Sequence, residues 1–354
     1  MPWSLEPARC RQSLVAEWGR SSATSPRVRP AQAMAGLTIK GRNMKMTRQV
    51  CFIAAAFAVL LASGGAYASN DEWWAWSVAT PVLEVNSPVS DGCPIESRDG
   101  LSLYIASMRI PGVGNDIFAA DRASKSEPFG EPKHLDAPVN TDANDFCPTP
   151  IFGSYLLFVS ERPGPDTCNA GQGSGDMYIV RRNAAFGWGE PRHLGCVETG
   201  TGPNTAGAEF SPSLVTTAEG TFLYFSSTVT GNHDIYQSRL RIDGTFARPT
   251  PVEAVNTEFD DRMPNVRSDG LEMVFSSLRP TDANGTPSIG NFDVYVSRRS
   301  STRKRWSPPV NLARAVNSPG SETRVTLSWD GRRLYFGRDG DIYSSTRRFV
   351  PHWQ

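Results

Sequence analysis

The sequence predicts an all-β protein: a five-bladed β-propeller of four-stranded blades, closed by an N-terminal strand that completes the last blade. Three observations predict this fold. The chain is rich in turn-forming residues, with 31 Gly and 27 Pro among 354 residues. One set of motifs occurs five times, at intervals of 54 to 61 residues. The last copy is one strand short, and the start of the chain carries the missing piece.

The repeat is clearest between Val255 and Asn317. An acidic residue stands shortly before Pro, a DG turn follows, and a hydrophobic run ends near Ser-x-Arg. A later segment begins with Asp, and the unit ends with an aromatic residue, Pro and an apolar position. A repeat of this length marks an array in which each unit buries its apolar face against its neighbours. The expected blades are residues 85–138, 139–196, 197–254, 255–315, and 316–348 together with 73–84.

Each unit is expected to contain four short strands. The DG turn favours a tight hairpin between the first two strands. Second strands such as LEMVFSS combine aromatic and branched residues with the alternation that is typical of half-buried strands. Third strands are expected to begin at Asp116, Asp176, Asp234, Asp293 and Asp341. Five such units in a ring form a propeller.

The two ends of the chain are expected to meet in the last blade. The unit that begins at Val316 supplies three strands only. The segment from Trp76 to Asn86 has the same aromatic-to-Pro-to-Asn spacing as the segment from Phe246 to Asn256. The first strand of the mature chain is therefore expected to be the fourth strand of the last blade.

The front of the chain reads as a leader rather than as part of the fold. Residues 1–43 show no hydrophobic periodicity and are interpreted as a start assigned too early or as disordered chain. Residues 44–68 have the basic start, the apolar run at 51–62 and the small-x-small end of a secretory signal peptide. That run is shorter than the roughly 20 residues that span a bilayer. We expect residues 69–354 to form one exported domain, periplasmic or secreted, without a membrane anchor.

The charge of the expected mature chain excludes two classes of partner. Residues 1–50 hold 9 of the 36 Lys and Arg but only 2 of the 36 Asp and Glu, and residues 51–68 hold none. The part from Ser69 onward therefore has 27 basic and 34 acidic residues, a net charge of −7. Nucleic acids and anionic membranes attract positive surfaces, so neither is expected as a partner.

Four cysteines remain after removal of the leader, which predicts two disulfides in an exported protein. Cys93 and Cys147 hold the same repeat position in adjacent blades, and Cys168 and Cys196 both belong to the second blade. Three pairings are possible, and we expect Cys93 with Cys147 and Cys168 with Cys196. No CxxC pair is present among these four, so a zinc site is not favoured.

An acidic residue precedes Pro, or its equivalent, at the start of every first strand. Propeller topology places these five acids around one mouth of the central channel. Close carboxylates need a neutralising partner. One interpretation is a ligand site at this mouth, with Ca²⁺ as the candidate ion because its ligands are oxygens. The favoured interpretation is that each acid caps backbone N–H groups or pairs with an Arg. The acids are Asp91, Asp145, Glu209, Asp261 and Glu322.

Arginines complete the set of candidate ligand-binding residues. Arg109, Arg162 and Arg279 end second strands, close to the start of the third strands. Arg–carboxylate pairs can be bidentate and orient both groups. In the third blade Val229 takes the place of the Arg, and the fifth blade does not align clearly at this point.

The repeats resemble the WD-like β-propeller repeats of the TolB type, which occur in exported bacterial proteins. The resemblance covers about residues 73–348 and implies the propeller fold. TolB itself has a separate N-terminal domain and six blades. This sequence shows neither feature, so the resemblance does not imply TolB's role in the envelope.

Two functions are expected from the sequence. The main expectation is a non-enzymatic, exported scaffold that binds a protein, peptide or glycan in the cell envelope. The alternative is a glycoside hydrolase that uses two carboxylates around the channel, about 5 to 5.5 Å apart if retaining and about 6.5 to 9.5 Å apart if inverting. The regularity of the acids favours the scaffold, because a catalytic pair should break the repeat. No catalytic residue is assigned, because no nucleophile–base spacing is evident.

Overall fold

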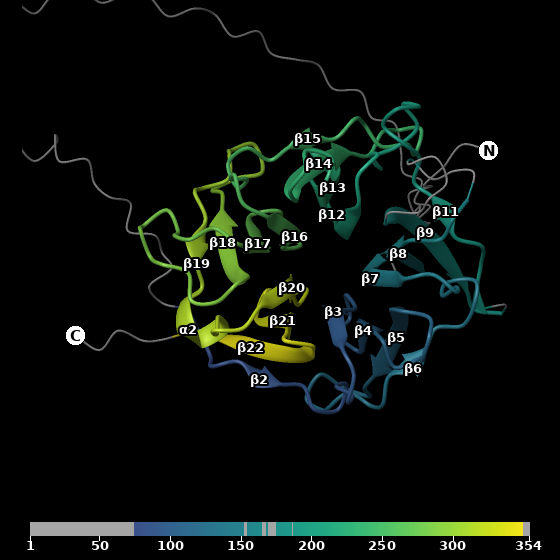
Figure 1. Ribbon diagram of the computed structural model, residues 1–354, viewed down its shortest axis with the longest axis horizontal. Coiled ribbons are helices and arrows are strands. Elements are labelled where there is room, and N and C mark those ends of the chain that lie inside the picture. The colour runs from purple at the N-terminus through teal and green to yellow at the C-terminus, as the bar shows by residue number, and fades with distance from the viewer. Residues whose placement is uncertain (1–73, 152–153, 165–167, 169–174, 186, 350–354) are drawn as a thin grey trace, which may run out of the picture. The chain divides into compact units, whose positions relative to one another are not determined.

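The computed structural model describes residues 74–151, 154–164, 168, 175–185 and 187–349. The expected leader, residues 1–43 and 44–68, lies outside these residues. Five antiparallel sheets stand around a central channel, and one edge strand of each sheet is innermost (Figure 1). The predicted all-β, five-bladed propeller is confirmed. Among the described residues, no helix has the length and apolar character needed to cross a membrane.

The first four blades follow the chain in order. Blade 1 consists of β3 (Asp91–Glu96), β4 (Ser102–Ser107), β5 (Asp116–Asp121) and β6 (Lys133–His134). Blade 2 consists of β7 (Asp145–Ile151), β8 (Tyr155–Ser160) and β9 (Asp176–Asn183), with β10 (Gly187–Trp188) and β11 (Arg192–His193) on its outer edge. Blade 3 consists of β12 (Glu209–Thr217), β13 (Gly220–Ser227), β14 (Asp234–Arg239) and β15 (Thr250–Pro251). Blade 4 consists of β16 (Asp261–Val266), β17 (Glu272–Ser277), β18 (Asp293–Arg298) and β19 (Val310–Asn311).

The fifth blade is built from both ends of the chain. Its inner strands are β20 (Glu322–Leu327), β21 (Arg333–Arg338) and β22 (Asp341–Phe349), preceded by the short helix α2 (Ala313–Val316). The outer edge of β22 pairs with β1 (Trp74–Trp76) and β2 (Thr80–Pro81). The predicted closure of the ring by the N-terminal strand is therefore confirmed.

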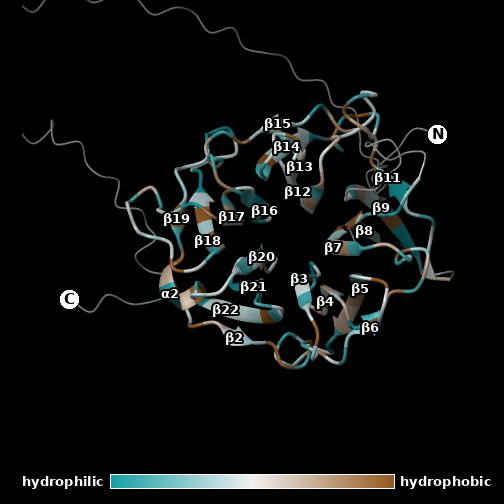
Figure 2. Cartoon of the chain, in the orientation of Figure 1, coloured by the Kyte–Doolittle hydropathy of each residue, from teal (hydrophilic) through white to brown (hydrophobic). Residues whose placement is uncertain are grey.

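Apolar side chains fill the space between neighbouring sheets. Every residue of β17 is buried, because sheets cover both of its faces. Figure 2 shows hydrophobic segments on β9 and β18, while hydrophilic residues occupy many of the connecting loops. One cluster joins Leu103 and Ile105 of blade 1 to Tyr335 and Ile342 of blade 5. Each fully buried side chain of this size stabilises the fold by roughly 1.5 to 3 kcal/mol.

The asparagine of the Val-Asn motif links each blade to the next. Its Oδ1 accepts a hydrogen bond from a third-strand N–H, and its Nδ2 donates to the carbonyl of the same residue. This residue is Asn86, Asn140, Asn204, Asn256 or Asn317. Between blades 2 and 3 the linking residue is Asn204, which binds Met177. It lies seven positions beyond Val197, the expected start of the unit, because the segment between them forms an extra loop.

Candidate functional site

The predicted acids begin the five innermost strands at one mouth of the channel, and all five are buried. In blade 1, Arg109 Nη2 lies 2.6 Å from Asp91 Oδ1 and also donates to the Val85 carbonyl. Its Nε donates to Ser107 Oγ. The pairs Arg162–Asp145, at 2.7 Å, and Arg279–Asp261 repeat these contacts. We call this set of contacts the arginine clamp.

Blade 5 has a clamp that the sequence did not reveal. Arg338 Nε lies 2.7 Å from Glu322 Oε1, and its Nη2 donates to the Val316 carbonyl. Arg338 stands directly opposite Glu322 in the strand register, whereas Arg279 lies two residues beyond Ser277, the residue opposite Asp261. The guanidinium therefore reaches its acid from a different position, and alignment of the repeats alone does not find it.

Glu209 of blade 3 has no arginine clamp. Thr205 Oγ1 and Ser227 Oγ donate to its Oε1 at 2.6 and 2.7 Å, while its Oε2 has no hydrogen-bond partner among the described residues. Burial raises the pKa of Glu209 to about 8, against the opposing effect of these two hydroxyl groups. Glu209 is therefore largely protonated at neutral pH.

At this mouth most of the acids are neutralised by arginines of the same blade. Four of the five acids have a guanidinium as their cationic partner, as the structural interpretation of the repeat expects. The remaining oxygens of Asp91 and Asp145 accept hydrogen bonds from the backbone N–H groups of Ser87 and Thr141. Calcium or another ligand at this mouth stays a prediction.

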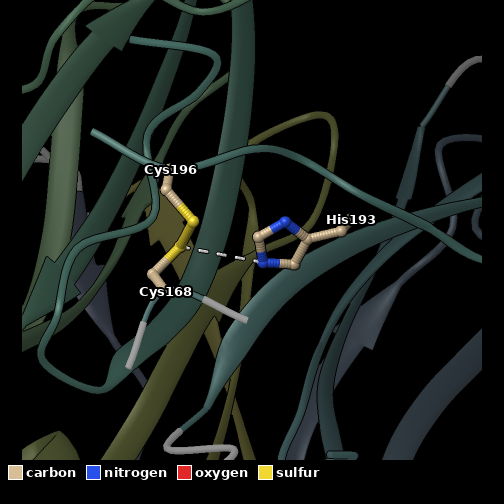
Figure 3. Close-up of side chains that lie close together, drawn as sticks. All are labelled: Cys168, His193 and Cys196. Atoms are coloured by element: carbon tan, nitrogen blue, oxygen red, sulfur yellow. Dashed lines mark hydrogen bonds between the residues drawn. A yellow bond between two sulfur atoms is a disulfide. The ribbon is translucent and has the colours of Figure 1, made fainter. Parts of the chain in front are cut away.

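The cysteines form one of the two expected disulfides. Cys168 and Cys196 are bonded, beside the His193 ring (Figure 3). These three residues are the one group of His, Cys, Asp and Glu in the described part of the chain with metal-ligand spacing, but the disulfide removes the two thiolates that a metal would need. The other expected pair is not bonded: Cys93 and Cys147 are free thiols whose side chains are hydrogen-bonded to each other.

A cavity of about 330 Å³ lies at the other mouth of the channel. All five innermost strands contribute residues to it from the ends that lie away from the acids. Glu96 is the one carboxylate among its described lining residues. Glu96 Oε1 accepts hydrogen bonds from Arg122 Nη2 at 2.6 Å and Tyr335 Oη at 3.1 Å. Burial raises the pKa of Glu96, although the Arg122 guanidinium acts in the opposite direction.

A groove with several aromatic residues continues from this cavity. It has a volume of about 570 Å³ and shares Arg98 and Trp329 with the cavity. Trp329 is 46% exposed, and the Arg98 guanidinium lies 4.2 Å from the centre of its ring. Asp99 also lines the groove, and the Ser97 hydroxyl and Leu101 N–H hold the pKa of Asp99 below its usual value. The aromatic lining residues are Tyr104, Tyr155, Trp188 and Trp329.

Neither this cavity nor the groove was predicted. The sequence analysis placed the functional face at the acidic mouth, where the repeat is most regular. The only sequence signal for the opposite mouth is the variation at the first hairpin turns, where Trp329 precedes the DG turn of blade 5 and Arg98 precedes that of blade 1.

No protein-family model and no curated protein matches this sequence. Solved structures do match its fold. A GH62 α-L-arabinofuranosidase catalytic domain from Coprinopsis cinerea is 14% identical, with 78% of this chain and 96% of that chain covered and a TM-score of 0.51. The α-L-arabinofuranosidase of Podospora anserina is 13% identical over 78% and 97%, with a TM-score of 0.48. A putative TolB from Agrobacterium tumefaciens is 17% identical over 79% and 99%, with a TM-score of 0.39.

These neighbours overturn the main functional expectation. The GH62 α-L-arabinofuranosidase domain, the neighbour with a TM-score of 0.51, is a glycoside hydrolase. The expectation of a non-enzymatic binding scaffold was therefore wrong, and the comparisons favour the alternative. At these identities the likeness itself establishes the propeller fold and not a particular activity.

Proposed function

We propose that this protein is an exported glycoside hydrolase whose substrate binds in the cavity and groove at the mouth that contains Glu96. The observation that carries the proposal is the position of Glu96, a carboxyl group with a raised pKa in the channel cavity, next to a groove rich in aromatic side chains. A cavity with a few convergent polar groups and a perturbed carboxyl group is typical of an active site.

In this proposal Glu96 is the general acid. Its raised pKa keeps a larger fraction of the group protonated near neutral pH, as donation of a proton to a glycosidic oxygen requires. Glycoside hydrolysis needs a second carboxyl group that is ionised. Asp99, in the adjoining groove, is the candidate, because its pKa is shifted in the opposite direction. Environments that move two carboxyl pKa values apart separate an acid from a base or nucleophile.

The groove supplies a surface for the sugar rings. Trp329 and Trp188 contribute flat apolar surface, while the Arg98 guanidinium offers hydrogen-bond donors beside them. This combination suits a ligand that has C–H faces and hydroxyl edges. Of the predicted partners, a glycan becomes the proposed substrate. Several neighbours are named as α-L-arabinofuranosidases, so an arabinofuranoside is the first substrate to test.

We also propose export to the periplasm or the medium. The basic and apolar leader of the sequence and the Cys168–Cys196 disulfide support an oxidising compartment. The motifs of the repeat support a relationship with the TolB-type group at the level of the single blade.

The test is hydrolysis of a panel of aryl glycosides and arabino-oligosaccharides by the purified protein. We expect release from at least one substrate, and a loss of more than about 100-fold in kcat for Glu96→Gln, a magnitude typical of a removed general acid. Glu258→Gln, at an exposed position, is the control. Trp329→Ala should raise KM. No hydrolysis of any substrate, or full activity of Glu96→Gln, would sink the proposal.

Asp99 needs a control within the repeat. Asp269 occupies the same turn position in blade 4 and accepts the same backbone hydrogen bond, from Leu271 at 2.9 Å, as Asp99 does from Leu101 at 3.0 Å. Asp269 does not line the groove in the described residues. We therefore expect Asp99→Asn to lower kcat strongly and Asp269→Asn to leave it unchanged. Equal effects would mean that Asp99 only stabilises its turn.

A further inference from the structure

A basic cleft lies between blade 5 and blade 1, beside the cavity that contains Glu96. It has a volume of about 420 Å³, and Glu96, Ser328 and Trp329 line both the cleft and the cavity. Trp329 also lines the groove, so one tryptophan borders all three spaces. Among the described residues that line the cleft, six are basic and two are acidic, a net charge of +4. The basic residues are Arg122, Lys125, Arg332, Arg333, Arg347 and Arg348.

Backbone pairing brings the four cations of blade 5 together. Arg332 directly precedes β21, which begins at Arg333, while Arg347 and Arg348 stand near the end of its antiparallel partner β22. The Arg347 N–H donates to the Arg332 carbonyl at 2.7 Å. Two paired strands therefore hold four of the six cations at one end of the sheet.

Two of the six cations serve the repeat itself. Arg122 and Arg347 hold the same place in their blades, and the Nε of each donates to the carbonyl of the glycine in the first hairpin turn. Arg299 makes the same contact in blade 4. Arg122 and Arg347 also have acidic partners, Glu96 at 2.6 Å and Glu272 at 3.0 Å respectively. Both therefore belong to the architecture, and their charges are balanced within the protein.

Three of the other cations, Lys125, Arg332 and Arg348, are exposed, and their side chains have no ion pair or hydrogen bond with the described residues. The second acidic residue of the cleft is Asp330. Its carboxylate accepts hydrogen bonds from Ser328 Oγ at 2.7 Å and from the Arg332 N–H at 3.0 Å, and it forms no ion pair with the described part of the chain. One carboxylate against three cations leaves two positive charges in the cleft without a counter-charge.

These cations depart from the repeat. The place of Arg348 is uncharged in blades 1, 2 and 4, and only Arg241 of blade 3 matches it. The expected mature chain, from Ser69 onward, has a net charge of −7, so its overall composition does not explain a positive cleft. A cleft lined by charges of one sign concentrates counter-ions, which favours a role in binding. In the other blades the residues in the place of Arg332 are also uncharged: Leu101, Ser154, Thr221 and Leu271.

We propose that the basic cleft binds the anionic group of an acidic oligosaccharide, a uronate carboxylate or a sulfate ester, while an adjoining sugar lies on Trp329. This inference rests on the proposed function and names the substrate class of the same site. Guanidinium groups bind carboxylates and tetrahedral oxyanions through parallel N–H groups. Arg332 and Arg348 supply two such groups, and Lys125 supplies a further positive charge.

The surroundings of the cleft favour a sugar over other polyanions. The exposed Trp329 offers an aromatic surface for the C–H face of a sugar ring. Nucleic acids and anionic membranes are bound by extended positive surfaces. Here the cations gather in one small cleft, and the groove on the other side of Trp329 contains the carboxylate of Asp99.

The test is calorimetric titration of the full chain with tetragalacturonate, a chondroitin sulfate tetrasaccharide, neutral arabinotetraose and sodium sulfate. We expect at least one acidic oligosaccharide to bind about 10-fold or more tightly than arabinotetraose, the gain that one charge-assisted contact provides. The two acidic probes distinguish a carboxylate from a sulfate ester. The gain should shrink as sodium chloride rises, because salt screens exposed charges. Sodium sulfate should bind more weakly than the preferred oligosaccharide, because it lacks the sugar.

Arg332→Gln and Arg348→Gln should each weaken the acidic complex by about 3- to 10-fold, and the double variant should lose the preference for an acidic ligand at an unchanged thermal midpoint. Arg241→Gln is the matched control, because it removes the same charge from the same repeat position in blade 3, and Arg241 is not among the described lining residues of the cleft. It should keep the preference. Trp329→Ala should weaken binding of acidic and neutral oligosaccharides alike.

Several outcomes would overturn the inference: no binding of either acidic oligosaccharide, equal affinity for acidic and neutral ligands, a preference that the double variant retains, or sodium sulfate binding as tightly as the oligosaccharides. Tighter binding of a DNA oligonucleotide or of phosphatidylglycerol vesicles would also overturn it. Binding requires no turnover, so absence of hydrolysis would sink the proposed function while the titration still decides the cleft. Conversely, hydrolysis that depends on Glu96 without any preference for acidic ligands would remove the cleft alone.

Discussion

Val229 stands where blades 1, 2 and 4 place an arginine, and the buried Glu209 of the same blade has two hydroxyl groups in place of a guanidinium. The other four acids of this ring are held by the arginine clamp. The exception changes the protonation state of Glu209, which has a direct consequence for stability.

Glu209→Gln should make stability less dependent on pH. The folded pKa of about 8 lies above the usual glutamate value, so the folded state holds this proton more tightly than the unfolded chain. Its contribution to stability is complete below the usual pKa of glutamate and declines as pH rises to about 8. The thermal midpoint of Glu209→Gln relative to wild type should therefore rise between pH 5 and about 8. The control Glu258→Gln should show a constant difference, and a flat difference for Glu209→Gln would contradict the raised pKa.

Removal of a clamp arginine should be among the most damaging single changes. Arg279→Met leaves Asp261 buried without its cation, which typically costs about 3 to 5 kcal/mol. The double variant Arg279→Met/Asp261→Asn should recover part of this loss, because it removes the uncompensated charge. Denaturant unfolding measures both values. Equal losses in the single and double variants would mean that packing, not charge, dominates this contact.

The closing strand can be tested at one side chain. Trp76 packs against the cluster of Val325 and Leu334 in blade 5, and the Arg347 guanidinium lies 4.8 Å from the centre of its ring. Trp76→Ala should cost about 2 kcal/mol, less than the 3 to 5 of a fully buried aromatic residue, because Trp76 is half-buried. Val78→Ala, which is 75% exposed, is the control. Similar unfolding free energies for both variants would argue against closure of the ring through β1.

Peptide mapping without reduction should find Cys168 joined to Cys196. Cys93 and Cys147 should carry the alkylating label after denaturation, because both are free thiols. Cys168→Ala should lower the free energy of unfolding by about 2 to 4 kcal/mol. A Cys93–Cys147 peptide in the same digest would show that the channel thiols are oxidised in the exported protein.

The number of blades, the order of their strands and the closure of the ring were predictable from the sequence. These features depend on local signals, the period-2 alternation of each strand and the DG turns, and five copies reinforce them. The positions of Asp91, Asp145, Asp261 and Glu322 at one mouth followed from the same register. The expected start of the third unit, Val197, lies before an extra loop, and the linking asparagine is Asn204, because an insertion leaves no periodic signal.

The partners of these residues were decided only by the tertiary structure. Arg324 donates a hydrogen bond to Thr149, which is 175 residues away in the sequence. Arg338 pairs with Glu322 from a different strand position than the arginines of the other clamps. The cavity around Glu96 likewise combines residues from all five innermost strands. Each blade supplies its own hairpins through local turn and strand preferences. The channel and its two mouths exist only after the blades close into a ring, so their charge balance and chemistry depend on contacts between residues that no local pattern brings together.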